Sequence, residues 1–229
     1  MVKRLIIITS AVFVLTYIPE VIFGWGMPFA LFALRPDDVL RRFYVWELVS
    51  YLFLHWGFFH IIFNMFALWM FGSDLERLWG RKEFLFYYFL TGIGAGVLDV
   101  LLNALFPSGV PTATLGASGA IYGLLLAYGL LFPDRPIYLY LLIPIKAKWF
   151  VVIMGVIEFV SSFSAPGSGV SHVAHLGGML FGFLYLRGSS LPYRLELRYH
   201  EWRRARLRRE FEVYARKQEK KDKAGRWIN

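Results

Sequence analysis

The middle of the chain carries the stretch LGASGAIYGLLLAYGLLF (residues 115–132), an apolar run that contains four glycines and a single serine. A long apolar run without charge is typical of a transmembrane helix, which needs roughly 20 such residues. Five further stretches share this character, so we expect an all-α, polytopic membrane protein with six transmembrane helices. The six predicted helices are approximately Leu5–Phe23, Phe58–Gly72, Phe84–Phe106, Leu115–Phe132, Trp149–Phe163 and Val170–Leu186.

The composition supports a membrane-embedded chain. Of the 229 residues, 57% are hydrophobic and only 18% are charged, whereas a soluble domain has about 25% charged residues. The absence of cysteine excludes disulfides and thiolate chemistry. The net charge is +9, and residues 187–229 hold 14 Lys/Arg against 6 Asp/Glu. We therefore expect a membrane domain at residues 1–190 and a basic tail at residues 191–229.

The positions of the basic residues predict the orientation. Lys or Arg precede the first predicted helix, follow the second, fourth and sixth, and are missing from the loops after the third and fifth. By the positive-inside rule, we expect both termini to be cytoplasmic. The expected location is the inner (plasma) membrane of the cell. The first helix lacks a signal-peptide cleavage site and is expected to be retained. The amphipathic loop at residues 24–57 is expected in the outer interface. Two interpretations of the tail are open, an amphipathic helix on anionic lipid headgroups or a solvated charged tail.

Polar side chains within predicted transmembrane helices are costly and are candidates for function. The first charge at the inner end of each helix lies 14 residues beyond His60, 16 beyond Ser118 and 12 beyond His175. These separations correspond to about 21, 24 and 18 Å along a helix. The three groups are therefore predicted to lie at a similar depth, below the outer edge of the membrane.

Small residues predict which of these helices approach each other. Gly119 and Gly123 form a small face on the fourth helix, and Gly178 and Gly182 form another on the sixth. Such faces allow helix backbones to pack closely. We expect this packing to bring the Ser118 hydroxyl within hydrogen-bond reach of the His175 imidazole, which can then act as its general base.

The surroundings of Ser118 suggest further roles. The fourth helix is short, so Pro107–Thr114 is expected to dip into the membrane as a loop and to leave Ser118 at a helix N-terminus. His60 and Asn64 share a helix face and, with the Ser118 amide, can form an oxyanion hole. Tyr122 lies one turn beyond Ser118 and either buttresses the imidazole or simply packs. No acidic residue adjoins these motifs in the sequence to complete a triad.

The segments HWGFFHIIFN (residues 55–64), GASGAIYG (116–123) and AHLGGMLFG (174–182) resemble the rhomboid family of intramembrane serine proteases. The resemblance covers roughly residues 45–186. Its departures are the adjacent pairs Trp46-Glu47, where the family usually carries Trp-Arg, and Glu76-Arg77, where it usually carries Glu-x-Arg.

The resemblance implies a six-helix rhomboid-like bundle that cleaves single-pass membrane proteins in or near their transmembrane segment. A protein of this kind uses no metal or cofactor, and no nucleic acid is expected as a partner. The roles that it implies are nucleophile for Ser118, base for His175, oxyanion stabilisation for His60 and Asn64, a stacking partner for Tyr122 and a tight loop at Gly116.

Three alternatives are weighed against this hypothesis. The first is a catalytically silent rhomboid-like protein that binds membrane clients. The second is a small proton-coupled transporter built on His60, His172, His175, Asp99 and Glu158. Asp99 and Glu158 are acidic residues within predicted helices that match no motif. The third is a zinc metalloprotease that uses His172 and His175, although neither an HExxH motif nor a nearby carboxylate supports it.

Overall fold

The computed structural model describes residues 1–106, 113–139, 143–164, 171–188, 203–204 and 206–216. The chain divides into two units, Met1–Gly188 and Ser189–Asn229. In the second unit the described residues are helical, and Leu207, Phe211 and Tyr214 expose their side chains. The proposed contact of this segment with anionic lipid stays a prediction.

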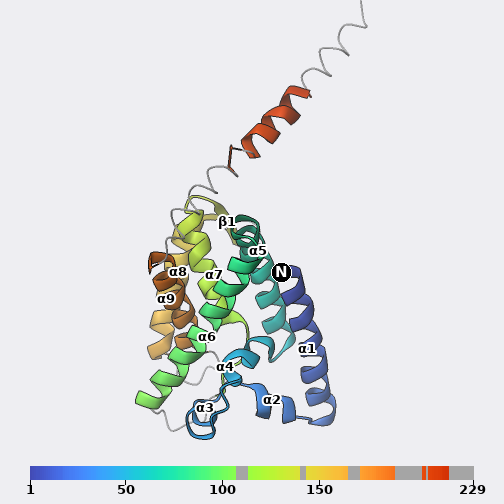
Figure 1. Ribbon diagram of the computed structural model, residues 1–229, viewed down its shortest axis with the longest axis vertical. Coiled ribbons are helices and arrows are strands. Elements are labelled where there is room, and N and C mark those ends of the chain that lie inside the picture. Colours follow the sequence, from blue (N-terminus) through green and yellow to red (C-terminus); the bar gives the residue numbers. More distant parts are fainter. Residues whose placement is uncertain (107–112, 140–142, 165–170, 189–202, 205, 217–229) are drawn as a thin grey trace, which may run out of the picture. The chain divides into compact units, whose positions relative to one another are not determined.

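Long helices build the first unit, as expected from the apolar runs (Figure 1). Four of them, α1, α5, α6 and α8, are each long and apolar enough to cross a membrane, while α7 has 14 residues and α9 has 17. Together they form an all-α, polytopic membrane bundle. Their bounds are α1 Val2–Phe23, α5 Phe58–Trp79, α6 Arg81–Leu105, α7 Ser118–Leu131, α8 Ala147–Ser164 and α9 His172–Gly188.

The predicted amphipathic loop between α1 and α5 is folded into short helices. They are α2 Met27–Phe32, α3 Pro36–Arg42, α4 Glu47–Ser50 and the 3-10 turn η1 Tyr51–Phe53. The indole of Trp46 donates a hydrogen bond to the Leu31 carbonyl at 3.0 Å, and the Glu47 carboxylate accepts one from the Arg35 amide at 2.8 Å. Burial raises the pKa of Glu47. The Trp46-Glu47 pair is thus accommodated inside the loop itself.

The second departure, Glu76-Arg77, lies at the end of α5. The Glu76 carboxylate accepts the amide hydrogen of Val2 at 2.9 Å, which ties α1 to α5. Arg77 pairs with Asp74 at 3.0 Å, and Asp74 also forms an ion pair with Arg135 beyond α7. The ionic contacts at this end therefore link α1, α5 and the segment after α7.

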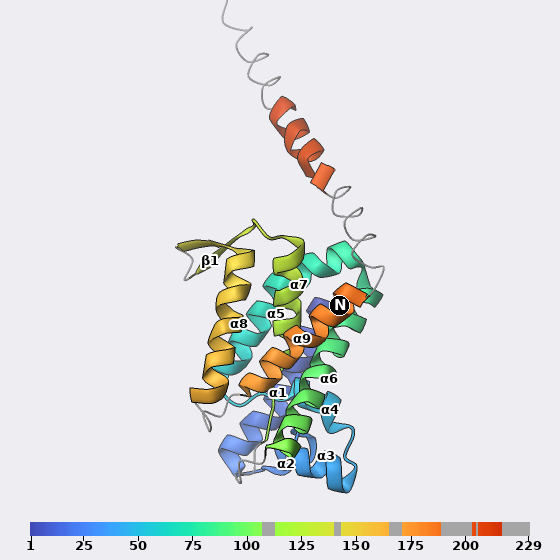
Figure 2. The same ribbon diagram turned by 90° about the vertical axis from the view of Figure 1, so that its left-hand side faces the viewer.

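An antiparallel hairpin that the sequence analysis did not predict connects α7 to α8. Its strands are β1 Pro136–Leu139 and β2 Ile143–Lys146. The hairpin lies at the opposite end of the bundle from α2, α3 and α4 (Figures 1 and 2). Beside it, Lys148 and Lys146 lie 3.2 and 3.3 Å from the carboxylate of Asp134 and lower the pKa of that group.

Helix α7 is the centre of the bundle, because it packs against α5, α6, α8 and α9. Nine of its 14 residues are buried. A Cβ atom placed on Gly178 of α9 would lie 1.9 Å from the carbonyl oxygen of Gly119, so the two backbones are in direct contact. At Gly123 and Gly182 the nearest atoms belong instead to side chains of α6. The predicted faces of small residues therefore contact each other at Gly119 and Gly178, whereas α6 packs against them at Gly123 and Gly182.

This close approach predicts that Gly178→Ala destabilises the bundle. The new methyl group meets backbone, which cannot rotate away, so we expect a loss of about 1–3 kcal/mol or more. The matched control is Gly155→Ala on α8, whose Cβ would lie 3.5 Å from the flexible Met179 side chain. Thermal unfolding in detergent checks the difference, and equal melting temperatures for the two variants would contradict it.

Candidate active site

Ser118 is the first residue of α7, as the sequence analysis predicted. The first N–H groups of a helix have no partner within the helix, and the helix dipole favours negative charge beside them. A helix of 14 residues is about 21 Å long, which is shorter than the hydrocarbon core of about 30 Å. The geometry is consistent with a helix that begins inside the membrane. Of the predicted dipping loop Pro107–Thr114, residues 107–112 lie outside the described part of the chain.

The residues just before Ser118 are held by the first loop. Gly116 has a φ of +112° and donates its amide hydrogen to the Tyr51 carbonyl at 2.9 Å. The Ala117 amide donates to Nε2 of His55 at 3.3 Å. Burial, with a smaller contribution from the neighbouring His60, lowers the pKa of His55 to about 3, so the ring is neutral and can accept this hydrogen bond. His55 therefore supports the loop that precedes Ser118.

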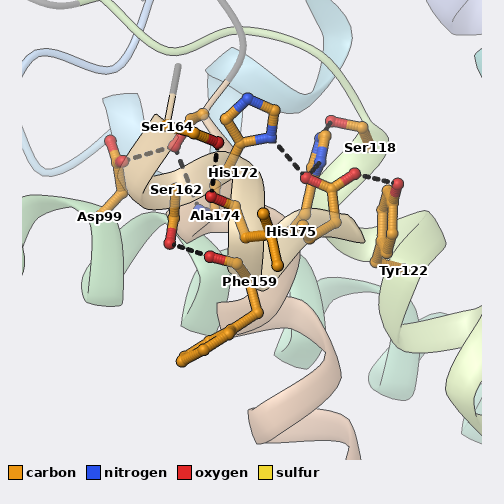
Figure 3. A network of polar contacts seen from close by, with 12 residues as sticks. Asp99, Ser118, Tyr122, Phe159, Ser162, Ser164, His172, Ala174 and His175 are labelled. Carbon is orange, nitrogen blue, oxygen red and sulfur yellow. Dashed lines mark hydrogen bonds and ion pairs between the residues drawn. The ribbon is translucent and has the colours of Figure 1, made fainter. Parts of the chain in front are cut away.

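His175 lies in the first turn of α9 with its Nε2 atom 2.7 Å from Oγ of Ser118 (Figure 3). The predicted contact between these two side chains is thus present. The ring of Tyr122 is stacked on the imidazole, with 4.3 Å between centroids and 12° between planes. Of the two interpretations of Tyr122, the structure favours the stacking partner. The imidazole is fixed on one edge by the serine and on one face by the tyrosine.

His60 and Asn64 lie on α5, near the loop that precedes Ser118. A Cβ atom on Gly116 would lie 2.8 Å from Nε2 of His60, so the His60 ring adjoins this glycine. The Asn64 side chain donates a hydrogen bond to the His60 carbonyl at 2.8 Å and is tied to its own helix. Oδ1 of Asn64 is buried with no hydrogen-bond partner among the described residues. The oxyanion roles of both side chains stay predictions.

Glu158 on α8 is a site residue that the sequence analysis missed. Its Oε1 atom accepts a hydrogen bond from the Tyr122 hydroxyl, and its Oε2 atom lies 2.6 Å from Nδ1 of His172 and 3.0 Å from Nδ1 of His175. The carboxylate comes from another helix, 14 residues before His172, so no local motif reveals it. The available signal was an acidic residue inside a predicted transmembrane helix, a position that is costly unless the carboxylate is paired.

Asp99 on α6 is the second buried carboxylate near the site. It accepts hydrogen bonds from the hydroxyls of Ser171 at 2.6 Å and Thr114 at 2.9 Å. The Ser171 oxygen in turn accepts the amide hydrogen of Ala174 at 3.1 Å, in the first turn of α9. The backbone of Thr114 pairs with that of Leu34 in the first loop. Asp99 thus ties the start of α9 to the segment that leads into α7.

Glu158, His172 and His175 each offer one ligand atom, and these three atoms lie within 4.8 Å of one another, the arrangement of a candidate metal site. The expectation that no carboxylate lies near the two histidines was wrong, because the carboxylate is contributed by α8. The Glu158 oxygen lies 2.6 and 3.0 Å from the two imidazole nitrogens. Ligand atoms around tetrahedral zinc are about 3.3 Å apart. The observed spacing therefore suits direct hydrogen-bond and ion-pair contacts better than coordination.

Comparison with known proteins places these residues in a wider group. The Rhomboid domain family profile matches residues 42–190. The chain is 29% identical over 180 residues to Rhomboid protein 1, mitochondrial, of Saccharomyces cerevisiae, which covers 77% of this chain and 52% of that protein. It is 29% identical over 166 residues to Rhomboid protease GluP of Bacillus subtilis, covering 70% of this chain and 29% of that one.

A third relative, Putative rhomboid protease YdcA of Bacillus subtilis, is 30% identical over 143 residues, which cover 61% of this chain and 64% of that protein. The chain thus spans about half or less of the first two relatives and less than two thirds of the third. The residues that the family profile matches include Ser118 and His175, together with Glu158.

The geometry before Ser118 predicts that Gly116→Ala impairs the site. An alanine there is strained at a φ of +112° and its Cβ would lie 2.8 Å from the His60 ring. Strain of this kind costs about 1–3 kcal/mol, which corresponds to roughly 5- to 150-fold in rate if the catalytic geometry absorbs it. The measurement is the rate at which a fluorophosphonate probe labels Ser118.

The matched control is Gly57→Ala, since Gly57 also has a positive φ, +98°, but an added methyl group there would have nothing within 4 Å. Gly57→Ala therefore carries backbone strain without the contact with His60, and we expect it to slow labelling less. Equal labelling rates for the two variants would show that the packing of Gly116 against His60 does not matter for the site.

Proposed function

Because the chain belongs to the rhomboid family, we propose that it is an intramembrane serine endopeptidase in which Ser118 is the nucleophile and His175 is the general base. The observation that carries the proposal is the 2.7 Å contact between Oγ of Ser118 and Nε2 of His175. A serine hydroxyl is a weak nucleophile until an adjacent base takes its proton. The contact supplies that base, and the stacked Tyr122 ring limits its rotation.

The proposed reaction is acyl transfer in two halves. Oγ of Ser118 attacks the carbonyl carbon of the scissile bond while its proton moves to Nε2 of His175. His175 then gives that proton to the leaving amine, and a water molecule activated by the same imidazole hydrolyses the acyl-enzyme. The Ser118 amide, His60 and Asn64 are the proposed donors to the oxyanion, and one such donor is typically worth about 10²–10³ in rate.

The proposed substrates are single-pass membrane proteins, cut within or just outside their transmembrane segment. Support comes from the position of Ser118 and His175 on helices of a membrane bundle, and from the two Bacillus subtilis relatives named as rhomboid proteases. The proposed location is the plasma membrane. Both termini are proposed to be cytoplasmic, since Lys and Arg flank the ends of the predicted helices that lie on the same side as the two termini. One relative is named as mitochondrial, so the membrane itself is part of the proposal.

Metal-assisted hydrolysis is the second candidate, and the cluster of Glu158, His172 and His175 is the observation that favours it. In that case the metal would activate water, and the Ser118 hydroxyl would not be essential. The two mechanisms therefore differ in their response to removal of the serine and to a chelator.

We expect Ser118→Ala and His175→Ala each to lower cleavage of a model single-pass substrate by about 10³-fold or more. The assay uses the purified full chain in detergent or liposomes, with and without a chelator. Ser162→Ala is the control, because its hydroxyl donates to the Phe159 carbonyl of its own helix and is exposed. Cleavage that survives in Ser118→Ala, or that stops with chelator, would refute the serine mechanism. A wild-type chain without any cleavage would favour a catalytically silent protein.

A further inference from the structure

The geometry points to Glu158 as a positioning residue for His175, so that Ser118, His175 and Glu158 form one connected network. This inference rests on the proposed function, since it concerns the base of the same reaction. It differs from the dyad derived from the sequence, because the third member is supplied by α8 and contacts the imidazole on the nitrogen opposite the serine.

Glu158 is buried, so its carboxylate requires polar partners within the protein. Helix α8 has three buried residues, Ala147, Val151 and Glu158, and the rest of its surface is largely exposed and apolar. A carboxylate inside a transmembrane helix is costly unless it is paired. Glu158 meets Tyr122 on α7 and both His172 and His175 on α9. The side chain is therefore directed into the site by partners that belong to the site.

The contact on Nδ1 determines what His175 can do. For Nε2 to accept the Ser118 proton, the neutral ring must carry its own proton on Nδ1. A carboxylate oxygen 3.0 Å from Nδ1 favours that tautomer. The Nδ1 atom is not aligned for a full hydrogen bond in this state. Alignment of this kind commonly tightens only in the substrate complex.

The second carboxylate oxygen acts on the face of the same ring. Oε1 of Glu158 accepts the Tyr122 hydroxyl hydrogen, and the Tyr122 ring lies flat on the imidazole. Glu158 thus contacts His175 at its edge, through Oε2, and supports its face through Tyr122. Nδ1 of His172 lies 2.6 Å from the same Oε2 atom, and this second contact restrains the carboxylate.

The chemical step remains balanced with Glu158 unprotonated throughout. When Oγ of Ser118 bonds to the carbonyl carbon, its proton passes to Nε2 of His175 and the ring becomes an imidazolium. The negative charge of Glu158 stabilises that cation in a site of low dielectric constant. The imidazolium then protonates the leaving amine and returns to neutral. Glu158 orients and stabilises the ring without taking the proton itself.

The test compares Glu158→Gln, which keeps the shape and removes the charge, with Glu158→Asp, which keeps the charge on a shorter side chain. For Glu158→Gln we expect kcat and the fluorophosphonate labelling rate of Ser118 to fall about tenfold or more, since general-base catalysis is worth about 10²–10⁴. We expect an unchanged KM and melting temperature, and a partial recovery of both rates in Glu158→Asp. Ser162→Ala, on the same helix with its hydroxyl bonded to the Phe159 carbonyl, is again the control expected to match wild type.

Several outcomes would overturn the inference. Wild-type labelling in Glu158→Gln would do so, as would a raised KM or lower melting temperature with labelling unchanged, because either result assigns Glu158 to packing alone. Chelator-sensitive wild-type activity restored by zinc would assign it to a metal. If Glu158→Gln does not fold, Glu158→Asp decides the question, provided that its melting temperature is native. Reduced labelling of Ser118 would then support the inference, and wild-type labelling would overturn it. Failure of the proposed function is distinct, since it requires inactive wild type or active Ser118→Ala.

Discussion

The direct contact between the backbones of α7 and α9 is the constraint on which the site depends. Gly178 has no room for a side chain because the Gly119 carbonyl occupies that space. Ser118 immediately precedes Gly119, and His175 lies three residues before Gly178 on the same side of α9. The contact between the two glycines therefore holds the Ser118 hydroxyl and the His175 imidazole close to each other. The 2.7 Å contact is therefore a consequence of helix packing as much as of the two side chains.

Two buried carboxylates further constrain how α7 and α9 pack. Asp99 reaches from α6 to Ser171 at the start of α9 and to Thr114 in the segment before α7. Glu158 reaches from α8 to the first turn of α9 and to Tyr122 on α7. Each carboxylate is costly in this environment unless its partners are in place, so each one favours the same relative position of α7 and α9. The polar groups thus select one position of α9 along α7, which the small residues alone would not determine.

The sequence predicted those parts of the structure that follow from local patterns. Apolar runs revealed the long helices, and glycine spacing revealed that α7 and α9 approach each other. It did not predict the hairpin Pro136–Leu139 with Ile143–Lys146, because a short apolar run does not by itself distinguish a strand from a helix. It also missed that Gly123 and Gly182 face α6, because spacing identifies a small face but not its neighbour. Glu158 was missed for the same reason, since only the packing of α8 brings it to His175.

The interdependence of the network follows from its burial. Tyr122, His172 and His175 all meet one carboxylate, and the loss of any one of them leaves Glu158 with an unmatched contact in an apolar environment. The effects of substitutions in this set are therefore not additive, because removing the first member already costs much of what the group provides. His175 is shared between this network and Ser118, so the energy that holds the network together is also the energy that holds the base in place. Buried polar groups that share partners in this way strengthen each other, which keeps the imidazole in one orientation.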